Sequence, residues 1–97
     1  MKNEELTVTH RPEGECFEAI VSGQRCVADY RKVGDVVRMT HTFVPASLEG
    51  RGIAAALVEA ALNWAASENL KVEPLCGYVR AYMKRNGRQG VQVVKPV

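Results

Sequence analysis

The 97 residues, 46% of them hydrophobic, suit one compact domain and leave no room for a second. With 13 basic and 11 acidic residues the formal charge is only +2, so there is no strong overall field and any anion site must be local. Three cysteines without metal-type spacing predict neither a disulfide framework nor a metal site, and no apolar run suits a signal sequence or a membrane span. We expect a single domain over residues 1–97 in a reducing cytoplasm, with no membrane partner.

Strands are expected in the first half of the chain, where hydrophobic residues recur every second position. The first is expected over Leu6–His10, and Arg11–Gly14 carries the Pro and Gly of a turn. The next three are expected over Cys16–Val21, Arg25–Arg31 and Val36–Val44, and Pro45 ends the last of them. These strands are short and consecutive, which favours antiparallel pairing.

The fourth predicted strand is the longest, and its alternation predicts two different faces. One face is expected to carry Val37, Met39, His41 and Phe43, and the other Val36, Arg38, Thr40 and Thr42.

Helical periodicity replaces alternation from Ile53 onward. Apolar residues at helical spacing are Ala54, Leu57, Val58, Ala61, Leu62 and Ala65, and Asn69 is expected to end the helix. A fifth strand is expected over Lys71–Cys76, a second helix over Tyr78–Arg85 and a last strand over Val91–Val94. Pro74 inside the fifth strand indicates an edge, a bulge or a splayed end. The outline is an α+β layer arrangement.

The turn before the long helix contains two glycines and no side chain that usually caps a helix. Gly50, Arg51 and Gly52 precede Ile53, so the first helix amides lack a capping oxygen and are available to an anion. Glycine permits close approach of a phosphate, and Arg51 adds a positive charge. The alternative is a tight turn with unusual dihedral angles and no ligand.

The segment Glu49–Ala54 resembles the acetyl-CoA-binding pattern of the GNAT superfamily of N-acetyltransferases: Gln or Arg, two residues, Gly, any residue, then Gly or Ala. Glu49 departs from the first position of that pattern. The flanking segments HTFVP and PLCGYVRAYMKR resemble those of short, single-domain GNAT-like acetyltransferases, and the likeness covers about residues 39–85.

The resemblance implies a mixed, mostly antiparallel sheet, acetyl-CoA as the cofactor and an N-acetyltransferase activity. It implies that loop amides bind the pyrophosphate and that the end of the fourth strand pairs with the pantetheine arm. The implied cofactor-binding residues are Phe43, Val44, Gly50, Arg51, Gly52, Ile53, Ala54, Ala55 and Tyr78.

Three catalytic candidates follow from the resemblance, each with a structural alternative. Tyr82 is a candidate acid for the CoA thiolate or an ordinary packing residue. Cys76, at the end of the fifth predicted strand and just before the second helix, is a candidate for an acetyl-enzyme intermediate or for positioning the cofactor thiol, or else a buried, inert thiol. His41 is a candidate base for the amine or a hydrogen-bonded residue of the sheet.

The acceptor is an amine, and both a protein or peptide lysine and small amines such as polyamines remain open. A non-catalytic CoA-binding module is one alternative function. Another is a nucleic-acid-binding domain that uses the basic cluster Lys84, Arg85 and Arg88, although cations at a helix C-terminus are more simply explained by the dipole. The chain is expected to be a monomer or a weak dimer.

Overall fold

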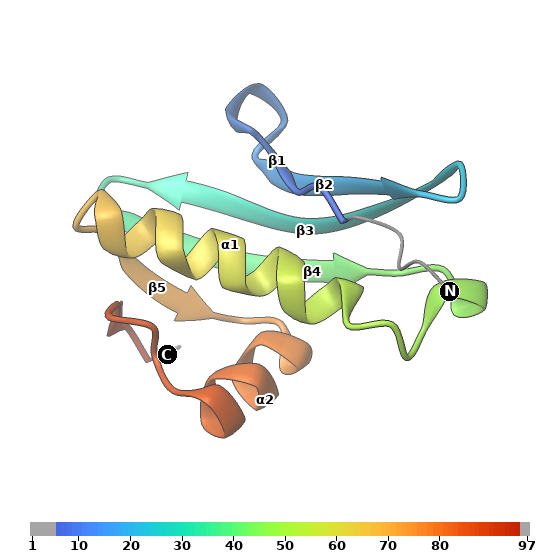
Figure 1. Cartoon of the computed structure of the whole chain (residues 1–97). Coiled ribbons are helices and arrows are strands. Elements are labelled where there is room, and N and C mark those ends of the chain that lie inside the picture. The colour runs from blue at the N-terminus through green and yellow to red at the C-terminus, as the bar shows by residue number, and fades with distance from the viewer. Residues whose placement is uncertain (1–5, 96–97) are drawn as a thin grey trace.

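The computed structural model describes residues 6–95, which form a six-stranded mixed sheet, two α-helices and two short 3-10 turns (Figure 1). The strands are β1 (Thr9–Arg11), β2 (Cys16–Val21), β3 (Gln24–Val33), β4 (Val36–Phe43), β5 (Lys71–Pro74) and β6 (Gln92–Val93). The helices are α1 (Ile53–Ser67) and α2 (Gly77–Asn86). The predicted α+β class, with a mostly antiparallel sheet and two helices after a glycine turn, is confirmed.

The strands lie in chain order across the sheet. Strands β1 to β4 are antiparallel, whereas β5 runs parallel to β4 and β6 runs parallel to β5. The hairpin between β2 and β3 turns through Ser22 and Gly23, whose φ angles of 51° and 76° suit the twist of two antiparallel strands. Parallel pairing needs a crossover, and α1 and α2 provide the two crossovers (Figure 1).

The first strand begins later than alternation predicts. Leu6 and Val8 do not pair with a neighbouring strand but pack, half-buried, against the core. The fifth strand also ends two residues early, at Pro74. The remaining element boundaries differ from the predicted ones by one or two residues, which is the usual uncertainty of helix and strand ends.

Helix α1 ends as its sequence predicts, at a residue that tolerates the left-handed conformation. Asn69 has φ 58°, and the amide of Leu70 donates to the carbonyl of Ala65 at 2.8 Å. This pairing is the Schellman arrangement, which satisfies a carbonyl that the helix leaves open.

The core lies between α1 and the sheet. Leu57, Ala61, Leu62 and Ala65 are completely buried on the face of α1 that the helical periodicity predicts. Burial of each leucine contributes about 1.5–3 kcal/mol, so this face holds α1 in place over the strands.

Four rings close one end of this core. They are those of His10, Phe17, Tyr30 and Trp64, and they come from β1, β2, β3 and α1. The His10 ring stacks on Phe17 with centroids 4.1 Å apart, and its Nε2 lies 2.7 Å from the Tyr30 hydroxyl. Burial lowers the pKa of His10 despite the nearby Glu13 carboxylate.

One irregularity decides what the end of β4 presents to each face of the sheet. His41 pairs with Asp29 on β3, but Met39 pairs with the next residue, Tyr30, so Thr40 is an extra residue on β4. This arrangement is a β-bulge, and the Thr40 hydroxyl donates to the carbonyl of Asp29 at 3.4 Å.

Beyond Thr40 the alternation of β4 is reversed. Thr42 faces the helices, whereas His41 and Phe43 lie on the opposite face, and half of the Phe43 side chain is exposed. The prediction that His41 and Phe43 share the face of Met39 is therefore wrong, because a period of two holds only while pairing is regular.

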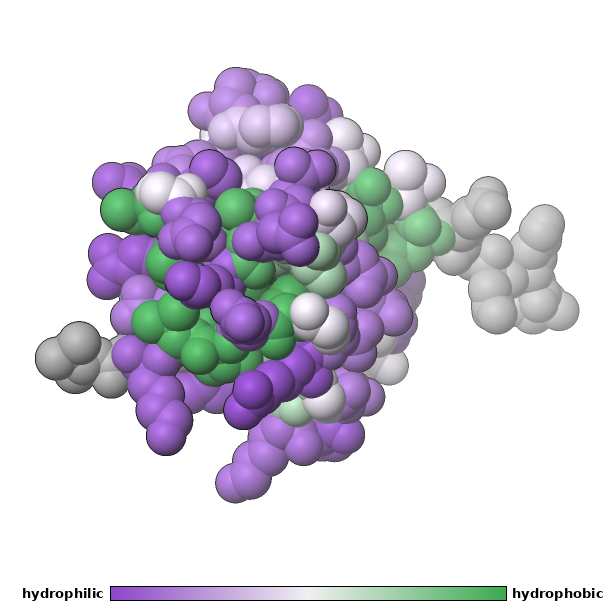
Figure 2. Space-filling view, turned by 90° about the vertical axis from the view of Figure 1, so that its left-hand side faces the viewer, coloured by the Kyte–Doolittle hydropathy of each residue, from purple (hydrophilic) through white to green (hydrophobic). Residues whose placement is uncertain are grey.

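Hydrophilic side chains cover most of the surface. Figure 2 views the end of the molecule where the β3–β4 turn, the end of α1 and the C-terminal segment lie, and apolar surface shows there in a hollow ringed by polar groups. Within residues 6–95, neither helix has the length and hydropathy needed to cross a bilayer.

Candidate active site

Strands β4 and β5 separate halfway along β4. Pairing between β4 and β5 runs from Val36 opposite Lys71 to Met39 opposite Pro74 and stops there, while β4 continues to Phe43. The last four residues of β4 therefore keep β3 on one side and have no strand partner on the other.

Pro74 marks the splayed end of β5. It pairs with Met39 of β4, whereas the pairing of β6 with β5 covers only Lys71 and Val72 and does not reach Pro74. After it, the amides of Leu75 and Cys76 both donate to the carbonyl of Met39, at 3.0 and 2.9 Å, and turn the chain out of the sheet toward α2. The pairing of β5 with both of its neighbours ends at or before Pro74, which agrees with the predicted splayed end of this strand.

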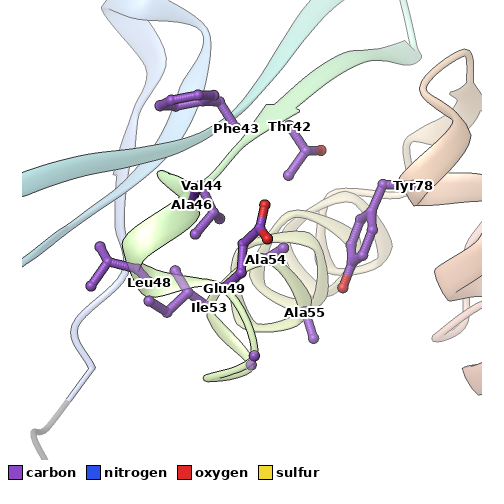
Figure 3. A pocket seen from close by; sticks show the side chains of 12 residues that line it. Thr42, Phe43, Val44, Ala46, Leu48, Glu49, Ile53, Ala54, Ala55 and Tyr78 are labelled. Atoms are coloured by element: carbon purple, nitrogen blue, oxygen red, sulfur yellow. The ribbon is translucent and has the colours of Figure 1, made fainter.

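A cavity of about 700 Å³ opens at this split, between the end of β4, the glycine turn and the start of both helices (Figure 3). Its volume lies within the usual range of small-molecule sites. The lining residues are Thr42, Phe43, Val44, Ala46, Leu48, Glu49, Gly50, Gly52, Ile53, Ala54, Ala55 and Tyr78. Eight of the nine residues that the sequence suggested for a cofactor are among them, and the ninth, Arg51, lies in the same turn without lining the cavity.

The glycine turn presents free helix amides to the cavity. Gly52 is the N-cap of α1 and no side chain caps the helix. The first intrahelical bond runs from the amide of Ala56 to the carbonyl of Gly52, so the amides of Ile53, Ala54 and Ala55 precede it. These donors carry the positive end of the helix dipole and suit an anion.

Both glycines are needed for backbone conformation. Gly50 and Gly52 have φ 85° and 78°, in the left-handed region that other residues adopt at a cost. A Cβ built on either would meet no atom within 4 Å, so the space above the turn is open to a ligand.

Cys76 lies beside the split, at the N-cap position of α2. Its Sγ is 3.6 Å from the hydroxyl oxygen of Thr42. Partial burial raises the pKa of the Cys76 thiol, whereas the nearby amides of Val79 and Tyr78, together with Thr42, lower it. The lowering is the larger effect, although no full capping bond forms, so the pKa lies below its usual value.

The other two cysteines differ from Cys76 in their surroundings. Cys16 and Cys26 are buried within the sheet, and burial raises the pKa of both thiols. Cys76 is therefore the cysteine with the largest thiolate fraction near neutral pH, which is the form that reacts.

Sequence reasoning missed Thr42 as a site residue. Alternation placed it on the face away from the helices, and only the bulge at Thr40 brings its hydroxyl to Cys76. No local sequence signal announces that bulge, because it arises from the pairing of β4 with β3.

The two tyrosines of α2 differ in their access to the cavity. Tyr78 is 39% exposed and lines the cavity, with its ring directed across the opening toward Ala55 in Figure 3. Tyr82, one turn later, is 9% exposed and is not a lining residue. Burial raises the pKa of both phenols, so both remain protonated near neutral pH.

His41 is exposed on the face of the sheet opposite the helices. It is separated from the cavity by the β4 backbone, so it can meet only a molecule that approaches the split from that opposite face. Among residues 6–95, no group of three His, Cys, Asp or Glu side chains could hold a metal ion.

Glu49 places a carboxylate in the cavity. Its side chain points toward the space between Thr42 and Ala54 (Figure 3). A negative charge here opposes the field of the α1 amides, so it weakens rather than strengthens the attraction of this site for an anion.

The candidate site thus combines a split between two parallel strands, a glycine turn with free helix amides, and a thiol beside the split. The sequence model of the GCN5-related N-acetyltransferase family matches residues 16–92. The chain therefore belongs to this family and is an acyltransferase of the GNAT type.

Named relatives agree with this assignment. Protein NATD1 from Homo sapiens is 43% identical over 84 residues, and the match covers 84% of this chain and 74% of the relative. Protein NATD1 from Mus musculus is 37% identical and that from Danio rerio is 33% identical, each over 84 residues, with 76% of each relative covered.

A solved structure shares the fold. The solution structure of a GCN5-like protein from Staphylococcus aureus superposes with a TM-score of 0.67 at 23% identity, covering 100% of this chain and 94% of that one.

Proposed function

We propose that the cavity binds acetyl-CoA and that the protein transfers its acetyl group to an amine. The observation that carries this proposal is that the free amides of α1 and the unpartnered end of β4 line the same cavity. The helix amides can donate hydrogen bonds to the pyrophosphate of CoA. The unpaired end of β4 can pair with the extended pantetheine arm, which carries amide groups of its own.

The geometry supports a division of roles along the cavity. The pyrophosphate lies on the turn from Gly50 to Ala55, with the guanidinium of Arg51 nearby, and the pantetheine arm runs beside Phe43 and Val44 toward Cys76. A backbone amide of β4 polarises the thioester carbonyl, and a phenol of α2 protonates the CoA thiolate as it leaves.

Tyr78 is our candidate for the acid that protonates the CoA thiolate, because Tyr78 lines the cavity and its phenol remains protonated near neutral pH. Tyr82 is the residue that the sequence resemblance indicates, but it does not line the cavity.

The proton of the acceptor amine has two possible destinations. His41 takes it when the amine approaches from the face of the sheet opposite the helices, and water takes it otherwise.

Two routes of transfer fit these groups. In the direct route the neutral amine attacks the thioester carbonyl and CoA leaves as the thiolate. In the second route the Cys76 thiolate attacks the carbonyl, CoA leaves and accepts a proton, and the amine then attacks the acetyl-cysteine and regenerates the thiol. The lowered pKa of Cys76 supports the second route.

The setting of the reaction is part of the same proposal. Residues 1–97 act as one domain in the cytoplasm, as a monomer or a weak dimer, with an amine of a protein or peptide lysine as acceptor.

The test is calorimetric titration of acetyl-CoA into the wild-type protein and into Gly52→Glu. The matched control is Gly23→Glu, since Gly23 has φ 76° against 78° for Gly52, both have open space above the backbone, and Gly23 lies in the β2–β3 turn. We expect saturable binding by the wild type and the control, and loss of binding in Gly52→Glu. No binding by the folded wild-type protein would overturn the proposal.

Mass spectrometry after a quenched single turnover separates the two routes. An acetyl adduct on the peptide that contains Cys76, formed and consumed at a rate that matches product formation, supports the covalent route. Formation of acetylated product without an acetyl adduct on Cys76 would exclude the covalent route and support the direct route. Binding of acetyl-CoA without turnover across many amines would instead reduce the protein to a CoA-binding module.

A further inference from the structure

A second cavity lies on the other side of α2. It has a volume of about 250 Å³ and is lined by Pro74, Arg80, Met83, Lys84, Arg88 and Val93. We call these six residues the basic groove. Its lining contains three cationic side chains and no acidic one, and its apolar members are buried or half-buried and form the floor.

The basic groove is separate from the acetyl-CoA cavity. With 3.6 residues per turn, Arg80, Met83 and Lys84 lie on the side of α2 opposite Tyr78 and Tyr82. No residue lines both cavities.

One of its cations is fixed in place. Nη1 of Arg80 donates to the carbonyls of Pro74 and Leu75, at 3.1 and 2.8 Å. The guanidinium is thereby held at the end of β5, with its Nε and Nη2 donors remaining for a ligand. Because Arg80 lies in the first turn of α2, where the helix dipole disfavours a cation, the dipole does not explain its position.

The groove begins close to the thiol. Pro74 is two residues from Cys76, so their Cα atoms are separated by at most about 7 Å. The two amide bonds to the Met39 carbonyl hold this segment in one conformation. One end of the groove, at Pro74, therefore lies in the same short segment as Cys76.

We propose that the basic groove binds an acidic side chain of a polypeptide acceptor whose lysine amine lies at Cys76. This inference rests on the proposed acetyl transfer and names the acceptor class. An extended peptide advances by roughly 3.3 Å per residue, so the acidic residue lies two to four positions from the lysine. The cations bind its carboxylate, and the apolar floor contacts its methylene groups.

A peptide fits this groove better than a nucleic acid does. The groove is short, and its lining offers no aromatic ring on which a base could stack. The formal charge of +2 provides no extended positive field along which a phosphate backbone could run.

The test is fluorescence anisotropy with two labelled ten-residue peptides. One has a central lysine with glutamates two to four positions away on each side, and the other has glutamines in their place. Both are titrated with the wild-type protein and with the double variant Lys84→Glu, Arg88→Glu. The matched control is Arg31→Glu, Lys32→Glu, which makes the same change in net charge on β3, outside the groove.

We expect the wild type to bind the glutamate peptide about tenfold more tightly than the glutamine peptide, and the groove variant to lose that difference while the control keeps it. Equal binding of the two peptides, or equal losses in the groove and control variants, would overturn the inference. Tighter, steeply salt-dependent binding of a single-stranded oligonucleotide would also overturn it, in favour of a nucleic-acid partner.

Acetyl-CoA titration of the same samples separates the two proposals. Unchanged acetyl-CoA affinity in the groove variant shows that its fold and first cavity are intact. Peptide discrimination without acetyl-CoA binding would overturn the proposed transfer while leaving an acidic-peptide site in the groove.

Discussion

The hydroxyl of Thr42 lies 3.6 Å from the sulfur of Cys76 and joins the unpaired end of β4 to the start of α2. This contact connects residues that are 34 positions apart in the sequence, and it exists because the bulge at Thr40 turns Thr42 toward the helices. It brings a hydrogen-bond donor to the thiol that already lies at a helix N-terminus.

Thr42→Val tests whether this contact stabilises the thiolate. Loss of the hydroxyl should raise the pKa of Cys76 and slow its alkylation by iodoacetamide at neutral pH by about three- to tenfold, as expected for the loss of one hydrogen bond that contributes roughly 0.7–1.4 kcal/mol. The pH dependence of the alkylation rate measures the pKa directly. The control is Thr9→Val, at an exposed position of β1 that does not line the cavity. An identical pH profile in wild type and Thr42→Val would contradict the assignment.

Removal of the Glu49 charge should strengthen acetyl-CoA binding. Glu49→Gln keeps the shape of the side chain, and charges several Å apart in an exposed site interact by roughly 0.5–1 kcal/mol, so the affinity should rise about two- to fivefold. Calorimetry at low and high salt checks this, because the gain should shrink as salt screens it. Glu68→Gln, beyond the far end of α1, should leave the affinity unchanged.

The two tyrosines of α2 can be told apart by rate. Tyr78→Phe should lower kcat by about a hundredfold, since it removes the phenol that we propose as the acid for the CoA thiolate. Tyr82→Phe should affect kcat much less, because its hydroxyl lies outside the cavity. If Tyr82→Phe instead lowers kcat more than Tyr78→Phe, the acid is Tyr82, as the sequence resemblance indicates. If both variants lower kcat only slightly, neither tyrosine protonates the CoA thiolate.

The stability of the protein should depend on His10 below neutral pH. Burial holds the pKa of His10 below its unfolded value, so the unfolded chain binds the proton more readily. The free energy of unfolding should therefore decrease as the pH falls below the ordinary histidine pKa of about 6.5 and level off below the folded pKa.

The comparison is urea unfolding of wild type and His10→Phe between neutral and mildly acidic pH. The phenyl ring keeps the stacking on Phe17 but cannot be protonated, so its stability should vary less over this interval. Equal pH dependence of the two proteins would assign the effect to other groups.

Local sequence was sufficient to predict the class of fold and the place of the glycine turn before α1. Glycine at positions 50 and 52 permits the left-handed conformations observed there, and the apolar period of 3.6 identifies the buried face of α1. Pro74 likewise predicted an irregular end of β5, because proline has no backbone N–H to donate to a neighbouring strand.

Tertiary structure decided which side chains meet at the site. The bulge depends on how β4 pairs with β3, and a shift of one residue there moves Thr42 toward Cys76 and His41 to the opposite face. The packing of α2 against α1 likewise selects Tyr78 over Tyr82 as the tyrosine that lines the cavity. The sequence by itself determined the strands, the helices and the glycine turn, since each depends on residues adjacent in the chain, whereas the reacting groups come together through pairing and packing between distant segments.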